Sequence, residues 1–220
     1  MFFRRRDTAG LLALPIIFII MPFLYGWQRT IDPLNLLVQA LMGCILFSLL
    51  ASSTSIGREG EGFANLLIAP IDSREILRGK LIASIVLSTP PTTIILLAIS
   101  LILGMRPEAI IALLAAGYIG MIETTAIGLI FGSRYPDFTT APRARSITRM
   151  GLLLSMITSG VAVALTWTPL IIYKLLHPEF LPIYSATAMT IIIGSIITII
   201  AYKLALQSFR ELCISQGDLL

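Results

Sequence analysis

The stretch GREGEGFANLLIAPIDSREILRGK, residues 57–80, separates two long apolar runs, 34–56 and 81–103. Its charged side chains are costly to place in hydrocarbon, so the stretch is expected to lie at a membrane surface. Each flanking run reaches the length of about 20 residues that a helix needs to cross a bilayer. This alternation indicates a membrane protein whose spans are joined by polar loops.

The composition extends this interpretation to the whole chain. Of its 220 residues, 56% are apolar and only 13% are charged, whereas a soluble domain averages roughly 25% charged residues. The mean hydropathy is +0.91. Because lipid offers no hydrogen bonds to the backbone, the apolar runs are expected to be helices. The sequence predicts one all-α transmembrane domain, 1–220, with six spans: 9–27, 34–56, 81–103, 109–132, 150–173 and 183–202.

The basic residues predict the orientation of these spans. Of the 16 lysines and arginines, all but Arg29, Arg106 and Lys174 fall in the segments 1–8, 57–80, 133–149 and 203–220. The positive-inside rule therefore places these segments, and both termini, in the cytoplasm of a protein of the cytoplasmic membrane. The net charge of +4 then reflects topology and contact with anionic lipids, and no nucleic acid is expected as a partner.

The N-terminal segment has two possible interpretations. Arg4, Arg5 and Arg6 precede an apolar run, as they would in a cleaved signal peptide. However, the run over 9–27 exceeds the usual apolar region of about 7–15 residues, and no Ala-x-Ala cleavage site follows it. An uncleaved first span is the favoured prediction.

Residues suited to catalysis are scarce. The single histidine, His177, falls in a short loop, and Cys44 and Cys213 form no metal-binding or disulfide spacing. The chain carries no Gly-x-Ser-x-Gly elbow, and neither a His-Glu-x-x-His zinc motif nor a phosphate-binding P-loop. We therefore expect no catalytic residue, no metal and no ATP bound by this chain.

The loop 57–80 carries signals for two helices. Phe63, Leu66 and Leu67 recur at the spacing of a one-sided helix over 61–69, and Pro70 ends it. Asp72 is a candidate N-cap, with Glu75 three residues later completing a capping box. The second helix is expected to continue into the third span. A simple interfacial helix, with its apolar side chains among the lipid headgroups, would also explain the first pattern.

This loop resembles the first cytoplasmic loop of ABC-2-type transporter permeases. The resemblance rests on Arg58-Glu59, Leu66-Leu67, Pro70, Arg74-Glu75-Ile76-Leu77 and Gly79-Lys80, and the segment GSRYPDF at 132–138 is also similar to family members. It implies a permease subunit of an exporter, paired with a second copy or a related permease. A separate ATPase subunit would bind ATP and Mg²⁺ and dock on a coupling helix over 61–69. The implied coupling residues are Arg58, Glu59, Phe63, Leu66, Leu67, Pro70, Arg74, Glu75 and Lys80.

Two features depart from that family. The eight residues before the first span leave little room for an amphipathic connecting helix. A re-entrant hairpin before the last span would fit only if the Trp-Thr-Pro segment at 167–169 breaks span five early. A short family member and one half of a larger permease fit equally well.

Glu123 is the one ionisable residue expected inside a span, ~13 Å above the inner end of its helix. Hydroxyl side chains are expected at a similar depth in the third span (Ser88, Thr89, Thr92 and Thr93) and in the fifth (Ser155, Thr158 and Ser159). One hypothesis is a polar belt along a translocation pathway, with Glu123 hydrogen-bonded to the third span and lining an inward-open cavity. The alternative is a buried glutamate that only joins two helices.

Three classes of function follow. The loop and the expected topology favour the permease subunit of an ABC-2 exporter. A stand-alone secondary transporter or channel is the alternative, although such proteins commonly show internal repeats that this sequence lacks. An intramembrane enzyme is the least favoured, because it would need a catalytic pair or metal cluster.

Overall fold

The computed structural model describes residues 17, 33–59, 62–63, 71–137, 147–176 and 182–217. These residues form the α-helices α2 (Pro33–Ser53), α4 (Ser73–Ile102), α5 (Pro107–Arg134), α6 (Arg149–Leu176) and α7 (Ile183–Gly217), and the 3-10 turn η2 (Gly57–Glu59). Within the same ranges the only β-type pairing is an isolated bridge between Pro136 and Ile147. The prediction of an all-α protein is therefore confirmed for the described part of the chain.

Four of these helices, α4 to α7, are long and apolar enough to cross a membrane, and α2 carries a shorter apolar stretch, Leu37–Ser53. The predicted first span, 9–27, lies outside the described residues apart from Ile17. The structure therefore supports a multi-pass membrane protein, while the count of six spans stays a prediction.

The second span ends at Ser53, three residues before the predicted end at Ile56. The cause is a run of hydroxyl side chains that bond to the backbone of the preceding turn. Thr54 Oγ1 donates to Leu50 O over 2.7 Å and Ser55 Oγ donates to Ser52 O over 2.7 Å. Such local bonds compete with the helical ladder and favour a turn.

Prolines do not interrupt the long helices. α4 contains Pro90 and Pro91, and α6 continues through Pro169 to Leu176. The expectation that residues 167–169 could break span five is therefore wrong. Proline is tolerated in membrane helices because neighbouring groups can compensate for the lost backbone bond.

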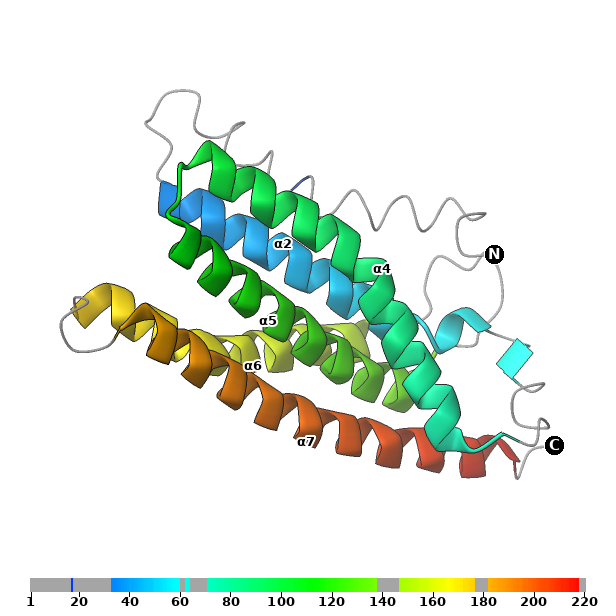
Figure 1. Ribbon diagram of the computed structural model, residues 1–220. Helices are drawn as coiled ribbons and strands as arrows, with labels where there is room; N and C mark the ends of the chain where they lie inside the picture. The colour runs from blue at the N-terminus through cyan, green and yellow to red at the C-terminus, as the bar shows by residue number, and fades with distance from the viewer. Residues whose placement is uncertain are drawn as a thin grey trace.

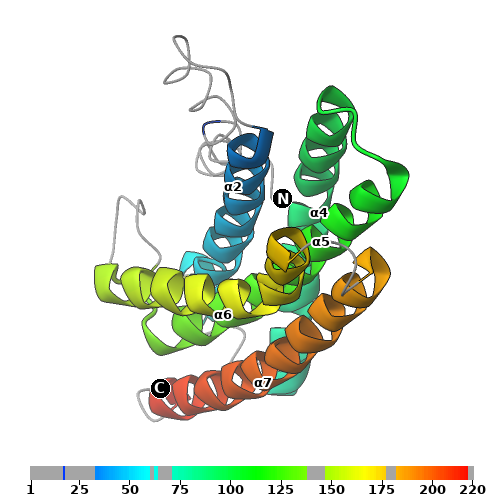
Figure 2. The ribbon, with the colours of Figure 1, turned by 90° about the vertical axis from the view of Figure 1, so that its left-hand side faces the viewer.

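Helix α5 is the centre of the bundle. Of its most apolar stretch, 67% of the residues are buried, against 28% in α4, 39% in α6 and 22% in α7. Figure 1 shows α5 running between α2 and α4 on one side and α6 and α7 on the other, and Figure 2 shows the same order after a turn of 90°. The other four helices therefore depend on α5 for their positions.

The outer faces of the bundle are apolar. Exposed side chains include Val86 and Ile94 on α4, Ile157 on α6 and Ile192 on α7, each more than half accessible. A soluble monomer rarely exposes such contiguous apolar area. Lipid is the solvent that fits these faces.

Glycines on α5 allow α2 to approach closely. A Cβ at Gly128 would overlap Ser52 Oγ and lie 2.8 Å from Leu49 O, and one at Gly132 would lie 2.5 Å from Ser53 O. Polar bonds reinforce this contact, because Ser48 Oγ donates to Met121 O over 3.0 Å. Small residues with interhelical hydrogen bonds are a common way to join helices in lipid.

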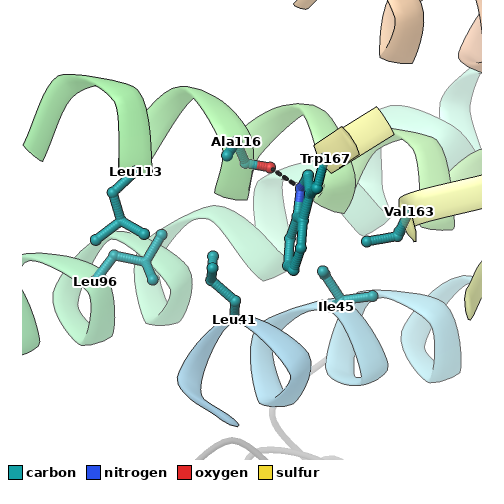
Figure 3. Packing of buried hydrophobic residues seen from close by; sticks show 7 residues of the cluster. All are labelled: Leu41, Ile45, Leu96, Leu113, Ala116, Val163 and Trp167. Atoms are coloured by element: carbon teal, nitrogen blue, oxygen red, sulfur yellow. Dashed lines mark hydrogen bonds between the residues drawn. The ribbon is translucent and has the colours of Figure 1, made fainter. Parts of the chain in front are cut away.

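A second contact closes the other end of the α2–α5 interface. The indole nitrogen of Trp167 on α6 donates to Ala116 O on α5 over 3.2 Å. Figure 3 shows its ring pointing toward α2 between Leu41 and Ile45. Trp167 therefore joins three helices through one side chain.

We expect Gly128→Ala to lower the stability of the bundle by about 1–3 kcal/mol, because the added methyl group overpacks a tight contact. Gly160→Ala on α6 is the matched control, since a Cβ there meets nothing within 4 Å. Thermal unfolding of the two variants in the same detergent measures the difference. Equal melting temperatures would contradict the assigned α2–α5 contact.

Candidate functional site

The end of the bundle formed by the ends of α2, α5 and α7 and the starts of α4 and α6 is called the basic end below. The described residues of the predicted coupling loop lie there, at 57–59, 62–63 and 71–80. Leu66, Leu67, Pro70 and most of the predicted helix 61–69 lie outside the described residues. Gly62 and Phe63 are helical.

Lys80 clamps η2 onto α4. Its Nζ forms an ion pair with Glu59 Oε1 and also donates to Ser55 O over 3.2 Å. The Lys80 side chain is only 11% exposed, so water screens this pair less than it screens a surface ion pair. The structure thus brings together two predicted coupling residues, Glu59 and Lys80, as partners of each other.

Phe63 faces the bundle. It is 3% exposed and meets the ring of Phe209 on α7 edge-on, with ring centroids 6.2 Å apart. Ile56, Leu77, Leu129 and Ala205 complete the same buried cluster. The alternative that Phe63 rests among lipid headgroups is therefore wrong, and its ring is not free to contact a partner protein.

The first turn of α4 is capped as predicted, with one difference. The Asp72 side chain accepts from Arg74 N over 3.2 Å, one residue earlier than the capping box requires. This backbone bond is the main reason that the pKa of the Asp72 carboxyl lies below its usual value. A negative charge here also complements the helix dipole.

Three further predicted coupling residues, Arg74, Glu75 and Arg78, are exposed on the first turns of α4. Arg58, in η2, is half-buried. The basic end therefore has an inner layer that holds the loop, formed by Glu59, Phe63 and Lys80, and an outer layer of charged side chains that solvent or a partner can reach.

Glu123 lies in the middle of α5 and is fully buried. Its Oε2 accepts from Thr166 Oγ1 on α6 over 2.8 Å, so the expected bond to the third span is wrong. Its Oε1 is buried without a hydrogen-bond partner among the described residues. With no exposed surface, Glu123 does not line an open cavity in this conformation, contrary to that part of the pathway hypothesis.

Three helices meet at this glutamate. A Cβ at Gly194 on α7 would lie 2.9 Å from Thr166 Cγ2 and would overlap Ile119 on α5. One turn further along, Ala201 packs with Ala126 and Ile127. Glycine at position 194 therefore lets α7 close over the Glu123–Thr166 pair.

The polar belt predicted on α4 and α6 does not assemble around Glu123. Thr93 Oγ1 bonds to Tyr118 on α5 over 2.6 Å, Thr92 Oγ1 donates to Met121 Sδ over 3.7 Å, and Thr89 Oγ1 donates to Ile85 O of its own helix. Ser88 is buried, and its Oγ has no partner within the described ranges. On α6, Ser155 bonds to its own helix, Ser159 is buried, and Thr158 is exposed.

Sequence reasoning missed the two partners that define these contacts, Thr166 and Phe209. Thr166 lies at a depth in its span similar to that of Glu123, so depth alone could have suggested it. Phe209 lies beyond the predicted end of the last span. Its signal is the apolar residue that recurs four positions after Ala205 on a helix that continues into polar sequence.

Residues 1–203 match a family model described as "Membrane protein of 12 TMs". No curated protein and no solved structure matches the chain. The family match and the four long apolar helices agree that this is a multi-pass membrane protein.

The Glu123–Thr166 pair can be tested by isosteric changes. We expect Thr166→Val to lower stability by roughly 1–3 kcal/mol, because it leaves a buried carboxyl without its donor. Thr168→Val is the matched control, since the Thr168 hydroxyl is exposed and donates to Ala164 O of its own helix. Thermal unfolding in detergent measures both variants, and equal losses would contradict the assigned role of Thr166.

Comparing Glu123→Gln with Glu123→Ala separates a charge-dependent role from a structural one. Glutamine keeps the acceptor for Thr166 and is expected to preserve the fold, whereas alanine removes it and leaves a cavity. If glutamine preserves both assembly and transport, a charge-dependent role for Glu123 is excluded.

Proposed function

The chain belongs to the family of membrane proteins of 12 TMs, and we propose that it is the membrane-spanning permease subunit of an ABC-2-type exporter. A separate subunit hydrolyses ATP and drives transport across the cytoplasmic membrane. In this proposal the basic end faces the cytoplasm, and the exposed first turns of α4 contribute to the surface on which the ATPase docks.

The observation that carries the proposal is the two-layer arrangement of the loop. Glu59, Phe63 and Lys80 attach it to α4 and α7, while Arg74, Glu75 and Arg78 stay exposed beside it. A loop that transmits force from a soluble subunit needs both properties, a firm attachment to the spans and a polar surface for the partner. An ordinary connection needs neither.

The family description supports a dimer. It names twelve spans, and the sequence of this chain predicts six. Two copies, or one copy with a related permease, would supply twelve. We therefore propose a dimer in which each chain presents its own basic end to an ATPase.

Other partners follow from the same proposal. The chain itself binds no ATP and performs no catalysis, and ATP with Mg²⁺ is held by the ATPase subunit. The apolar outer faces of α4, α6 and α7 contact lipid in the regions that the second permease does not cover.

A stand-alone secondary transporter or channel is the second candidate. The buried Glu123 favours it, because intramembrane carboxyls often bind protons or ions in such proteins. Its one hydrogen bond to Thr166 and its complete burial give a structural role instead in this conformation. The ABC-2 proposal accounts for more of the described contacts.

Co-purification with the ATPase tests the proposal. The tagged chain is extracted in detergent, and bound proteins are identified by mass spectrometry and assayed for ATP hydrolysis. We expect a Walker-motif ATPase with the wild-type chain, and a loss of about tenfold or more with Arg74→Glu/Arg78→Glu, because reversed charges on a docking surface oppose complementary ones.

Arg106→Glu is the matched control, since Arg106 is equally exposed but caps the opposite end of α5. Surface positions are used because changes at Glu59 or Phe63 would disturb the packing itself. A wild-type chain that retains no ATPase would refute the proposal and favour the stand-alone transporter.

A further inference from the structure

Helix α7 continues beyond the apolar span predicted for it. That span ends at Tyr202, whereas the helix reaches Gly217. The segment 203–217, called the α7 extension below, is two-sided: Ala205 and Phe209 are fully buried, while Lys203, Gln207 and Arg210 are exposed. A helix with one apolar and one polar face packs on protein at a surface and does not continue through lipid.

The apolar face of the α7 extension holds the loop. Phe209 is fully buried, and its ring lies at 84° to the ring of Phe63. This edge-to-face arrangement is a favoured geometry for an aromatic pair. Leu77 of α4 and Leu129 of α5 belong to the same cluster. Figure 1 shows the start of α4 beside the far end of α7.

The loop therefore has two attachments to two different helices. The ion pair of Glu59 with Lys80 joins it to α4, and the contact of Phe63 with Phe209 joins it to α7. A displacement of the loop would act on α4 through the first attachment and on α7 through the second. The two attachments also differ in chemistry, one ionic and one aromatic, so each can be removed alone.

We propose that Phe209 is a positioning residue that couples the loop to α7. This inference rests on the proposed function, in which the ATPase acts on the loop. Phe209 contacts no nucleotide and no ATPase. It acts through Phe63, so that movement imposed on the loop reaches α7 as well as α4.

The test uses the complex of the full chain with its ATPase in detergent, followed by hydrogen exchange. Exchange is compared between the resting complex and the complex trapped with ATP and vanadate, for wild type and Phe209→Leu. Leucine keeps an apolar side chain in the cluster but removes the ring contact. In wild type we expect trapping to change exchange in the loop, in α4 and in the α7 extension.

In Phe209→Leu the resting amide of Phe63 is expected to exchange about 2- to 10-fold faster, the range that corresponds to loss of one aromatic pair. The ATPase stays bound and the trapped response of α4 persists, while the response of the α7 extension falls at least about twofold. A purely structural role would lower the melting temperature but leave that response unchanged.

Two controls complete the design. Leu204→Ala changes the exposed face of the same extension, where Leu204 is 49% accessible, and should leave both readouts as in wild type. The double variant Phe63→Leu/Phe209→Leu should weaken the α7 response no more than either single variant, because both remove one shared contact.

Each outcome decides between the two proposals. An α7 response that is unchanged in Phe209→Leu, although Phe63 exchanges faster, overturns the role of Phe209 and leaves the exporter proposal standing. A wild-type chain without a bound ATPase overturns the exporter proposal and the inference together.

Discussion

The close approach of α2 and α5 is the contact on which the rest of the bundle depends. Lipid removes the hydrophobic driving force between helices, so association relies on close packing and on interhelical hydrogen bonds. Gly128 and Gly132 supply the first, and Ser48 with Met121 O supplies the second. Because α5 also contacts α4, α6 and α7, its position against α2 sets the frame for all of them.

That frame explains why the two polar features of the chain have such different surroundings. Glu123 lies on the most buried helix, where its one described partner is the hydroxyl of Thr166 on the neighbouring α6. The loop 57–80 lies where the helices end, so the same kinds of side chain divide between an inner and an outer layer. Lys80 is paired and largely buried, whereas Arg78, two residues earlier, is exposed.

The loop is therefore part of the bundle rather than an appendage to it. Phe63 packs in one cluster with residues of α4, α5 and α7, and Lys80 joins the end of α2 to the start of α4 through Ser55 O. A docking protein that pushed on this segment would act on helices that start and end far apart in the sequence. This property makes the basic end suited to transmit force, whichever substrate the spans handle.

The sequence alone determined the all-α class, the apolar helices α4 to α7 and the cap at Asp72, because these depend on hydropathy and on neighbours within one turn. It also identified Glu59, Phe63 and Lys80 as residues of interest, but not their partners. Tertiary structure decided that Glu123 bonds to Thr166 instead of α4, and that Phe63 packs on Phe209 instead of facing lipid or a partner. Those pairings join positions 43 residues apart in one case and lie at the two ends of the described bundle in the other, and only the rotation and register of packed helices select them.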